Sequence, residues 1–359
     1  MLRPRDTRIQ PARRNGFTRT DLLAATGSAV VLFAVGSTVL ARNGGANDSH
    51  YKLMELGQAH ACYAGDWNDR QWTALPYDVG QYGDSCSTYL SQSGACPPQQ
   101  LLGFDSNGAM WAYYLGSSGA CAAPGYPGNC GNWTAYRPIE FEGASAGWGA
   151  AFIPNTIGFR QYLSQRFYSN EWYAEDDPAY AWASTQFDLP REFSFDGGNY
   201  EDSSYCLSPA AMFHPGVFRR PSQGGFQRPS QFADSYRAPS VSQCAYPELK
   251  TRMCERGWYR NAPAAGLAFT AGLDAAPVTL FFDGSVATVS MREAHAQDRI
   301  AVASSGFVEG LWSRDTPFDK AGWRLGVQES VDGTYNGFHI LTTDGILGRD
   351  LLIREKGGF

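Results

Sequence analysis

An uncharged, largely apolar run from Leu22 to Ala41 constrains this chain more than any other feature, because it contains no Lys, Arg, Asp or Glu. Its length is about that of one helix crossing a bilayer, roughly 20 residues at about 1.5 Å each. Six arginines lie within the first twenty residues, although the whole chain carries a net charge of −6. Positive charge before the run predicts a cytoplasmic N-terminus and an extracytoplasmic remainder. We therefore expect a single-pass protein of the inner (cytoplasmic) membrane.

The segment before this run has an ordered pattern of its own. A basic leader, residues 1–16, ends at Gly16, Phe17 opens the next segment, and Asp21 stands just before the apolar run. This order resembles the N-terminus of type IV prepilins and pseudopilins, the type IV pilin-like family. In that family a prepilin peptidase cuts after the Gly and methylates the new N-terminus, so the resemblance implies processing between Gly16 and Phe17. Asp21 replaces the usual Glu, and Arg19 interrupts a normally apolar stretch.

Asp21 has a physical rationale as an assembly residue. A carboxylate at the edge of the hydrocarbon layer is costly unless it finds a partner. The ammonium group created by cleavage before Phe17, on a neighbouring subunit, would supply one. The alternative is that Asp21 lies in the headgroup region beside Arg19.

Two other export signals also fit this N-terminus. Arg13 and Arg14 could begin a twin-arginine signal, and the apolar run could belong to a removable signal peptide with weak cleavage candidates in residues 37–41. The run is longer than the usual apolar region of such peptides, about 7–15 residues. Every one of these signals sends the rest of the chain across the membrane.

The composition beyond the run is typical of an exported globular domain. Charged residues make up only 18% of the chain, whereas Gly (40), Tyr (19), Phe (21) and Trp (10) are abundant. This balance favours a loop-rich fold that contains β-structure over a helical bundle. An acidic domain without a basic patch argues against nucleic acid as a partner.

Eight cysteines, with no Cys-x-x-Cys pair among them, favour disulfides over a zinc ribbon or a thioredoxin-like redox motif. The pairs that close the shortest loops are Cys86–Cys96, Cys121–Cys130 and Cys244–Cys254. Sequence alone leaves the connectivity open, and unpaired buried thiols are the alternative.

The stretch after the apolar run has the pattern of an amphipathic helix. A single stripe with spacings of three and four contains Leu53, Leu56, His60, Tyr63 and Trp67. Large pilin-like proteins are similar here, since their membrane helix continues into a half that packs on a sheet. We expect residues 42–70 to have this role, and we expect His60 to be packed in the interior, not to bind a ligand.

The clearest β signal is two strand-like runs that flank Asp283-Gly284 within residues 278–289. They predict a hairpin with a two-residue turn, in which both residues have φ > 0. The stretch also resembles the C-terminal "F-A-D-G-x-V" signature of large pilin-like proteins of the planctomycete type. Leu273 stands where that signature has a His, so any role of the His is lost.

One short motif raises the question of an enzyme. Ser145 is the centre of a Gly-x-Ser-x-Gly pentapeptide, as in the nucleophile elbow of hydrolases, with His295 or His339 as a nominal base and Asp283 as a nominal acid. The oxyanion segment of such enzymes is missing, and chance matches are frequent in a chain so rich in Gly. We expect a loop of small residues at Ser145 and no catalytic residue.

A second short motif resembles a calcium loop. Asp332, Thr334 and Asn336 occupy the first, third and fifth positions, with Gly337 at the sixth. The twelfth position, normally a bidentate Glu, is Thr343. We therefore expect an ordinary pair of turns and no cofactor, with calcium as the alternative.

Together these features predict an α+β fold in which a long N-terminal helix, embedded in the membrane over its first half, packs on an antiparallel sheet. The expected parts are a leader at 1–16, a transmembrane helix at 17–41, its amphipathic continuation at 42–70, and an enlarged loop-rich domain at 71–359 with an irregular loop at 208–246. The expected function is that of a structural or accessory subunit of a type IV pilus or type II secretion pseudopilus, with a cell-surface filament as a second expected location. Its partners would be the prepilin peptidase and other pilin-like subunits. A membrane-anchored extracytoplasmic hydrolase and an exported binding protein are the alternatives.

Overall fold

The computed structural model describes residues 46–73, 100–104, 110–114, 132–134, 138–139, 141, 149–189, 202–229, 234–235, 237–256, 273, 275–306, 309–316 and 336–354. The chain divides into two compact units, Met1–Asn47 and Asp48–Phe359. Apart from Ala46 and Asn47, the described residues belong to the second unit.

Helix α2, Ala46–Asp66, is the longest element of the described residues. The stripe predicted from the sequence becomes its buried side, since Leu53, Leu56 and His60 are wholly enclosed. After α2 the chain turns through Asn68 and Asp69, both of which have positive φ. Trp67 differs from the prediction, because it follows the helix in this turn and its side chain is 49% exposed.

The sheet that receives α2 is antiparallel. Its strands lie in chain order and comprise β4 (Tyr205–Leu207), β5 (Thr251–Glu255), β6 (Val278–Phe281) and β7 (Val286–Thr288). The α+β class with an antiparallel sheet is therefore confirmed. Strands β4, β5 and β6 are buried along almost their whole length, as expected for a sheet covered on both faces.

A second sheet of three strands lies elsewhere in the unit. It consists of β1 (Gln100–Phe104), β2 (Met110–Tyr114) and β3 (Asn132–Thr134). Strands β1 and β2 are antiparallel, whereas β2 and β3 are parallel. This sheet is therefore mixed, whereas the four-stranded sheet is wholly antiparallel.

The remaining helices are mostly short. The α-helices are α4 (Ile157–Arg160), α5 (Pro178–Ala183), α6 (Pro209–Met212) and α8 (Met291–Ser304). The 3-10 helices are η2 (Ala150–Phe152), η3 (Asn170–Trp172), η4 (Ser184–Gln186), η5 (Pro215–Val217), η6 (Pro221–Gln223), η8 (Val241–Gln243) and η10 (Gly345–Leu347). Several begin with Pro at the first helical position, where its missing N–H costs no hydrogen bond.

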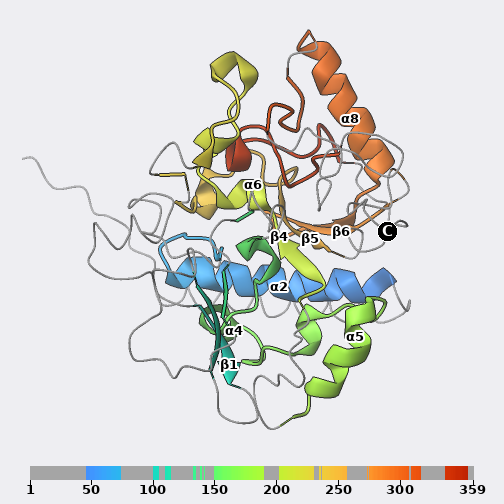
Figure 1. The fold of residues 1–359 in the computed structure, drawn as a ribbon. Coiled ribbons are helices and arrows are strands. Elements are labelled where there is room, and N and C mark those ends of the chain that lie inside the picture. Colours follow the sequence, from blue (N-terminus) through green and yellow to red (C-terminus); the bar gives the residue numbers. More distant parts are fainter. Residues whose placement is uncertain are drawn as a thin grey trace, which may run out of the picture. The chain divides into compact units, whose positions relative to one another are not determined.

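Helix α2 lies between the four-stranded sheet on one side and the segment with α4 and α5 on the other (Figure 1). On the sheet side it meets β6 at Gly57, where an added Cβ would lie only 2.9 Å from Leu280. On the opposite side the ring of His60 packs 4.4 Å from that of Phe159. The helix is therefore an inner layer of the unit.

Within the described residues, no helix has the length and apolar character needed to cross a membrane. The Leu22–Ala41 run lies outside those residues.

Candidate functional site

The hairpin predicted at Asp283-Gly284 is present, but its turn differs from the expected one. Strands β6 and β7 pair with Leu280 opposite Val286, and the N–H of Gly284 donates to the carbonyl of Phe281 at 3.0 Å. The N–H of Phe281 donates to the carbonyl of Ser285 at 2.9 Å, so Phe281 and Ser285 are the residues that close the hairpin loop. The loop thus has three residues, with a left-handed conformation (φ +83°) at Gly284 and not at Asp283. Such a loop needs only one residue with φ > 0, and this residue is Gly.

Asp283 is tied into this turn. Its carboxylate accepts hydrogen bonds from the N–H and the hydroxyl of Ser285, and it lies 3.7 Å from the guanidinium of Arg354. The nominal base His339 is wholly buried, and burial lowers its pKa to about 3. Asp283 therefore holds the hairpin turn in place.

Most of the other residues singled out from the sequence lie outside the described residues. They are Gly16, Phe17, Asp21, Ser145, Asp332 and Thr334. Asn336 is described, and its Oδ1 accepts a hydrogen bond from the N–H of Phe338 at 3.1 Å. In the described part of the chain, no group of three or more His, Cys, Asp or Glu side chains is placed to hold a metal ion.

The suggested Cys244–Cys254 disulfide is wrong in this structure. Cys244 and Cys254 are both free thiols, as is Cys62. Cys254 belongs to β5 and stands opposite Cys206 of β4 in the antiparallel register, whereas Cys244 follows the short helix η8. The short separation of Cys244 and Cys254 in the sequence therefore did not predict that their thiols are paired, because Cys254 lies within the sheet on β5 and Cys244 lies outside it. The other suggested pairs lie outside the described residues.

The prediction that His60 is packed in the interior is confirmed. Both ring nitrogens are buried and make no hydrogen bond with any of the described residues. Burial, together with the charge of Arg252, lowers the pKa of His60 well below its usual value. The imidazole is thus neutral at physiological pH and acts as an aromatic core side chain.

A buried polar network that the sequence did not reveal surrounds Lys250. Its Nζ donates to Asp350 Oδ2 at 2.9 Å, to Thr342 Oγ1 at 2.7 Å and to Ser208 Oγ at 3.0 Å. Asp350 also accepts from the hydroxyl of Thr342 at 2.5 Å and from the N–H of Thr251 at 2.8 Å. All three protons of the ammonium group therefore have an acceptor, as a buried charge requires.

This network has the parts of a serine–lysine pair but holds them in an inactive arrangement. A lysine that activates a serine must be neutral to take its proton. Burial lowers the pKa of Lys250, and the Asp350 carboxylate opposes this shift. Burial by itself raises the pKa of Asp350, but the ammonium of Lys250 and the hydrogen bonds outweigh it and lower the pKa. Ser208 donates its own proton to His339 O at 2.5 Å and is fully enclosed, so the arrangement is structural.

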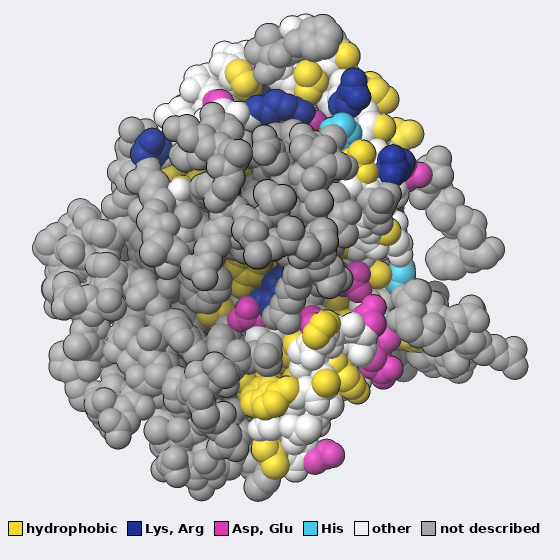
Figure 2. Space-filling model, turned by 45° about the vertical axis from the view of Figure 1, so that its right-hand side comes forward, with side chains coloured by type: hydrophobic (Ala, Val, Ile, Leu, Met, Phe, Trp, Pro, Cys, Tyr) yellow, Lys and Arg dark blue, Asp and Glu magenta, His cyan; other side chains and the backbone are white. Residues whose placement is uncertain are grey.

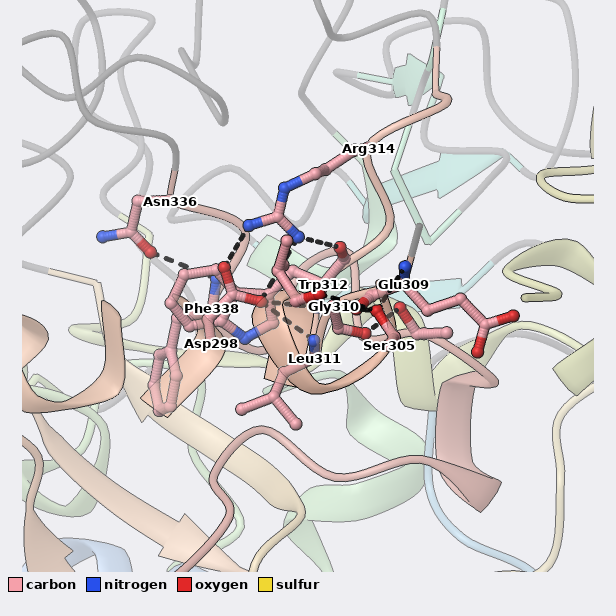
Figure 3. Close-up of polar contacts among 11 residues, drawn as sticks. Asp298, Ser305, Glu309, Gly310, Leu311, Trp312, Arg314, Asn336 and Phe338 are labelled. Atoms are coloured by element: carbon pink, nitrogen blue, oxygen red, sulfur yellow. Dashed lines mark hydrogen bonds and ion pairs between the residues drawn. The ribbon is translucent and has the colours of Figure 1, made fainter. Parts of the chain in front are cut away.

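A second polar cluster joins the C-terminal half of α8 to the segment after it (Figure 3). The buried carboxylate of Asp298 accepts the N–H of Leu311 at 2.9 Å and forms an ion pair with Arg314. Ser305 accepts the N–H of Glu309 at 2.9 Å and donates to its carbonyl at 2.6 Å. Asp298 and Ser305 thus form hydrogen bonds with backbone groups that would otherwise lack a partner in this loop. The role of the cluster is therefore structural.

Two surface hollows are lined by charged groups that already have partners. One, of about 280 Å³, lies beside this cluster, and its Arg220 is paired with Asp344. The other, of about 420 Å³, lies near the turn after α2, and its His214 accepts the N–H of Gly216 at 3.0 Å.

The third hollow, which we call the Arg252 hollow, has a volume of about 450 Å³. It lies between the C-terminal half of α2 and the β6–β7 turn, and its lining includes Gly57, Ala61, Ala64 and Gly65 of the helix together with Arg252 and Phe282. Only 6% of Arg252 is exposed, and its guanidinium stacks over the ring of Phe282 at 5.4 Å. Its Nε and Nη2 are buried and have no hydrogen-bond partner among the described residues.

On the face seen in Figure 2, the Lys and Arg side chains of the described residues lie mostly in the upper half, and those of Asp and Glu mostly in the lower half. Apolar side chains are interspersed with both groups. The described part of this face therefore does not form one continuous surface of a single charge.

No protein-family model, curated protein or solved structure matches this chain.

Proposed function

We propose that this chain is a pilin-like, single-span subunit, structural or accessory, of a type IV pilus or type II secretion pseudopilus. The prepilin-like order of Gly16, Phe17 and Asp21 before an uncharged run of membrane-spanning length supports this function. The globular unit would then lie outside the cytoplasmic membrane, and no residue would act as a catalyst.

The observation that carries the proposal is the placement of α2 against the antiparallel sheet. The helix begins a few residues after the apolar run. Its Ser49 accepts a hydrogen bond from the hydroxyl of Tyr205 on β4 at 3.1 Å, and Gly57 lies against Leu280 on β6. A helix that begins shortly after an apolar run of membrane-spanning length in the sequence, and that packs on a sheet of four strands in chain order, is the arrangement expected of a pilin-like subunit.

Association of such subunits would depend on the apolar run. Small side chains at Ala24, Ala25, Gly27, Ser28 and Ala29 permit neighbouring helices to approach closely in the membrane. Asp21 would pair with the ammonium group of Phe17 on the next subunit, which offsets the cost of a carboxylate near hydrocarbon. The prepilin peptidase and other pilin-like subunits are the partners that this function requires.

The mature N-terminus tests the proposal. Mass spectrometry of the full-length protein, expressed with a prepilin peptidase, should find a chain that begins at Phe17 and carries an N-methyl group. Gly16→Leu should keep the leader attached, whereas the matched control Asn15→Ala should be processed normally. A mature chain that begins near Asn43 would show removal by a signal peptidase and would refute the pilin-like function.

A further inference from the structure

Arg252 is an unusual side chain for the interior of a sheet. It lies on β5, is almost wholly buried, and has Nε and Nη2 without hydrogen-bond partners. Burial lowers the pKa of Arg252 to about 10, although Cys244 and Asp69 nearby oppose the shift. A guanidinium remains charged at such a pKa, so the fold keeps a buried positive charge that its own hydrogen bonds do not satisfy. Such a charge is costly unless something pairs with it.

The carboxylates at the edge of the Arg252 hollow are engaged elsewhere. Asp69 accepts the N–H of Ser242 at 3.0 Å, and Asp283 is held by Ser285 and Arg354. Both acids line the hollow, so they add negative charge at its rim. A ligand with a single negative charge therefore suits the site better than a dianion, which the rim would repel.

The rest of the lining is small and apolar. Gly57, Ala61, Ala64 and Gly65 form the side contributed by α2, and Phe282 and Val241 lie on the other side. An added Cβ at Gly65 would have no atom within 4 Å, so the hollow has free space beside the helix. This surface can receive a short hydrocarbon group but offers it few polar partners.

We propose that the Arg252 hollow binds a monocarboxylate that carries a short apolar group. Nε and Nη2 of Arg252 are enclosed, so the carboxylate pairs with the positive charge of the guanidinium from the side of the group that lines the hollow. The apolar group lies against the small residues of α2. A free short-chain acid and the C-terminal carboxylate of a peptide offer the same chemistry. This site does not depend on the pilin-like function.

Ligand titration of the full-length protein in an uncharged detergent tests the site. The probe is 4-methylpentanoate, and 4-methylpentanol is the neutral control with the same hydrocarbon group. Saturation-transfer NMR and calorimetry should detect saturable binding of the acid, with an affinity at least tenfold higher than that of the alcohol. N-acetyl-leucine and its amide separate the two sources, because only a peptide-terminus site prefers N-acetyl-leucine to the free acid. Equal binding of acid and alcohol, or binding of neither, would overturn the proposal.

Two variants test separately the contribution of the Arg252 charge and that of the free volume beside Gly65 to binding. Arg252→Met removes the guanidinium and should weaken binding of the acid at least tenfold, whereas Arg299→Met, at an exposed position on α8, should not change it. Gly65→Leu should fill the hollow and weaken binding to a similar degree with Arg252 intact. If Arg252→Met does not fold, the affinity of Gly65→Leu for the acid and the comparison of acid with alcohol in the wild type still test the site. Unchanged affinity in Gly65→Leu would place the acid elsewhere and refute the site.

Discussion

Lys250 and Asp350 are 100 residues apart in the chain, yet Nζ of the first lies 2.9 Å from Oδ2 of the second, and both side chains are wholly buried. The pair connects the start of β5 to the C-terminal segment. Thr342 and Ser208 complete its hydrogen bonds.

Breaking this pair should destabilise the fold strongly. In Asp350→Asn the ammonium of Lys250 stays buried without its counter-charge, so we expect the free energy of unfolding to fall by about 3–5 kcal/mol. Asp283→Asn is the matched control, because its carboxylate lies in an exposed turn and should cost about 1 kcal/mol or less. Urea denaturation followed by tryptophan fluorescence measures both. Equal losses in the two variants would contradict the assigned role of the pair.

His60 should make the protein sensitive to acid. Burial lowers its pKa in the folded state, so below about pH 6.5 the unfolded chain binds a proton that the folded chain does not. Stability should therefore fall as the pH drops, by about 1.4 kcal/mol per pH unit for one such proton. His339, with a pKa of about 3, adds to the same loss between pH 6.5 and 3.

In His60→Phe the slope of the unfolding free energy against pH should decrease between pH 6 and 4. The expected decrease is the contribution of one bound proton, about 1.4 kcal/mol per pH unit. His295→Phe, at a half-exposed position of α8, serves as the control. The comparison uses slopes, so a change in packing from the larger ring does not affect it. An unaltered slope in His60→Phe would mean that His60 is protonated in the folded state.

Gly284 should tolerate some side chains and not others. Nothing lies within 4 Å of a Cβ added there, so a substitution costs only the strain of φ +83°. Gly284→Val should lose about 1–3 kcal/mol of stability, because β-branched residues rarely adopt this conformation. Gly284→Asn should lose less, since Asn adopts it more readily. Thermal unfolding gives both values, and equal melting temperatures for Gly284→Val and the wild type would argue against a tight turn.

The described cysteines should differ in reactivity. Cys62 is exposed on α2, whereas Cys206 and Cys254 are enclosed between β4 and β5, where burial raises the pKa of Cys254 well above its usual value. A maleimide should label Cys62 in the folded protein within minutes and label the other two only after denaturation. Peptide mapping by mass spectrometry identifies the labelled residues. Rapid labelling of Cys254 in the folded state would contradict the buried pairing of β4 with β5.

The features that the sequence predicted well depend on local patterns. The stripe of α2 was visible because helical spacing repeats every three to four residues, and the Asp283-Gly284 turn was visible because few dipeptides favour a hairpin so strongly. The details of that turn were wrong, because the choice between two and three loop residues depends on the strand register.

The features that the sequence missed depend on contacts between distant segments. Strand β4 has only three residues and ends directly before the proline-rich segment 208–246, which we had expected to be irregular. Lys250 has the appearance of an ordinary surface lysine until Asp350 is brought beside it. Arg252 likewise becomes notable only when α2 and the β6–β7 turn enclose it, since no motif in its neighbourhood indicates a buried charge.

The close contact of Gly57 with Leu280 also has a mechanical consequence. A pull along the axis of α2 would load this contact in shear, together with the hydrogen bonds of Ser49 to Tyr205 and of Lys52 to the carbonyl of Tyr173. In that direction the helix must slide past strands and loops on both of its sides at once, so many contacts share the load. A domain built in this way would resist tension along its helix better than a pull that peels the helix away from one end.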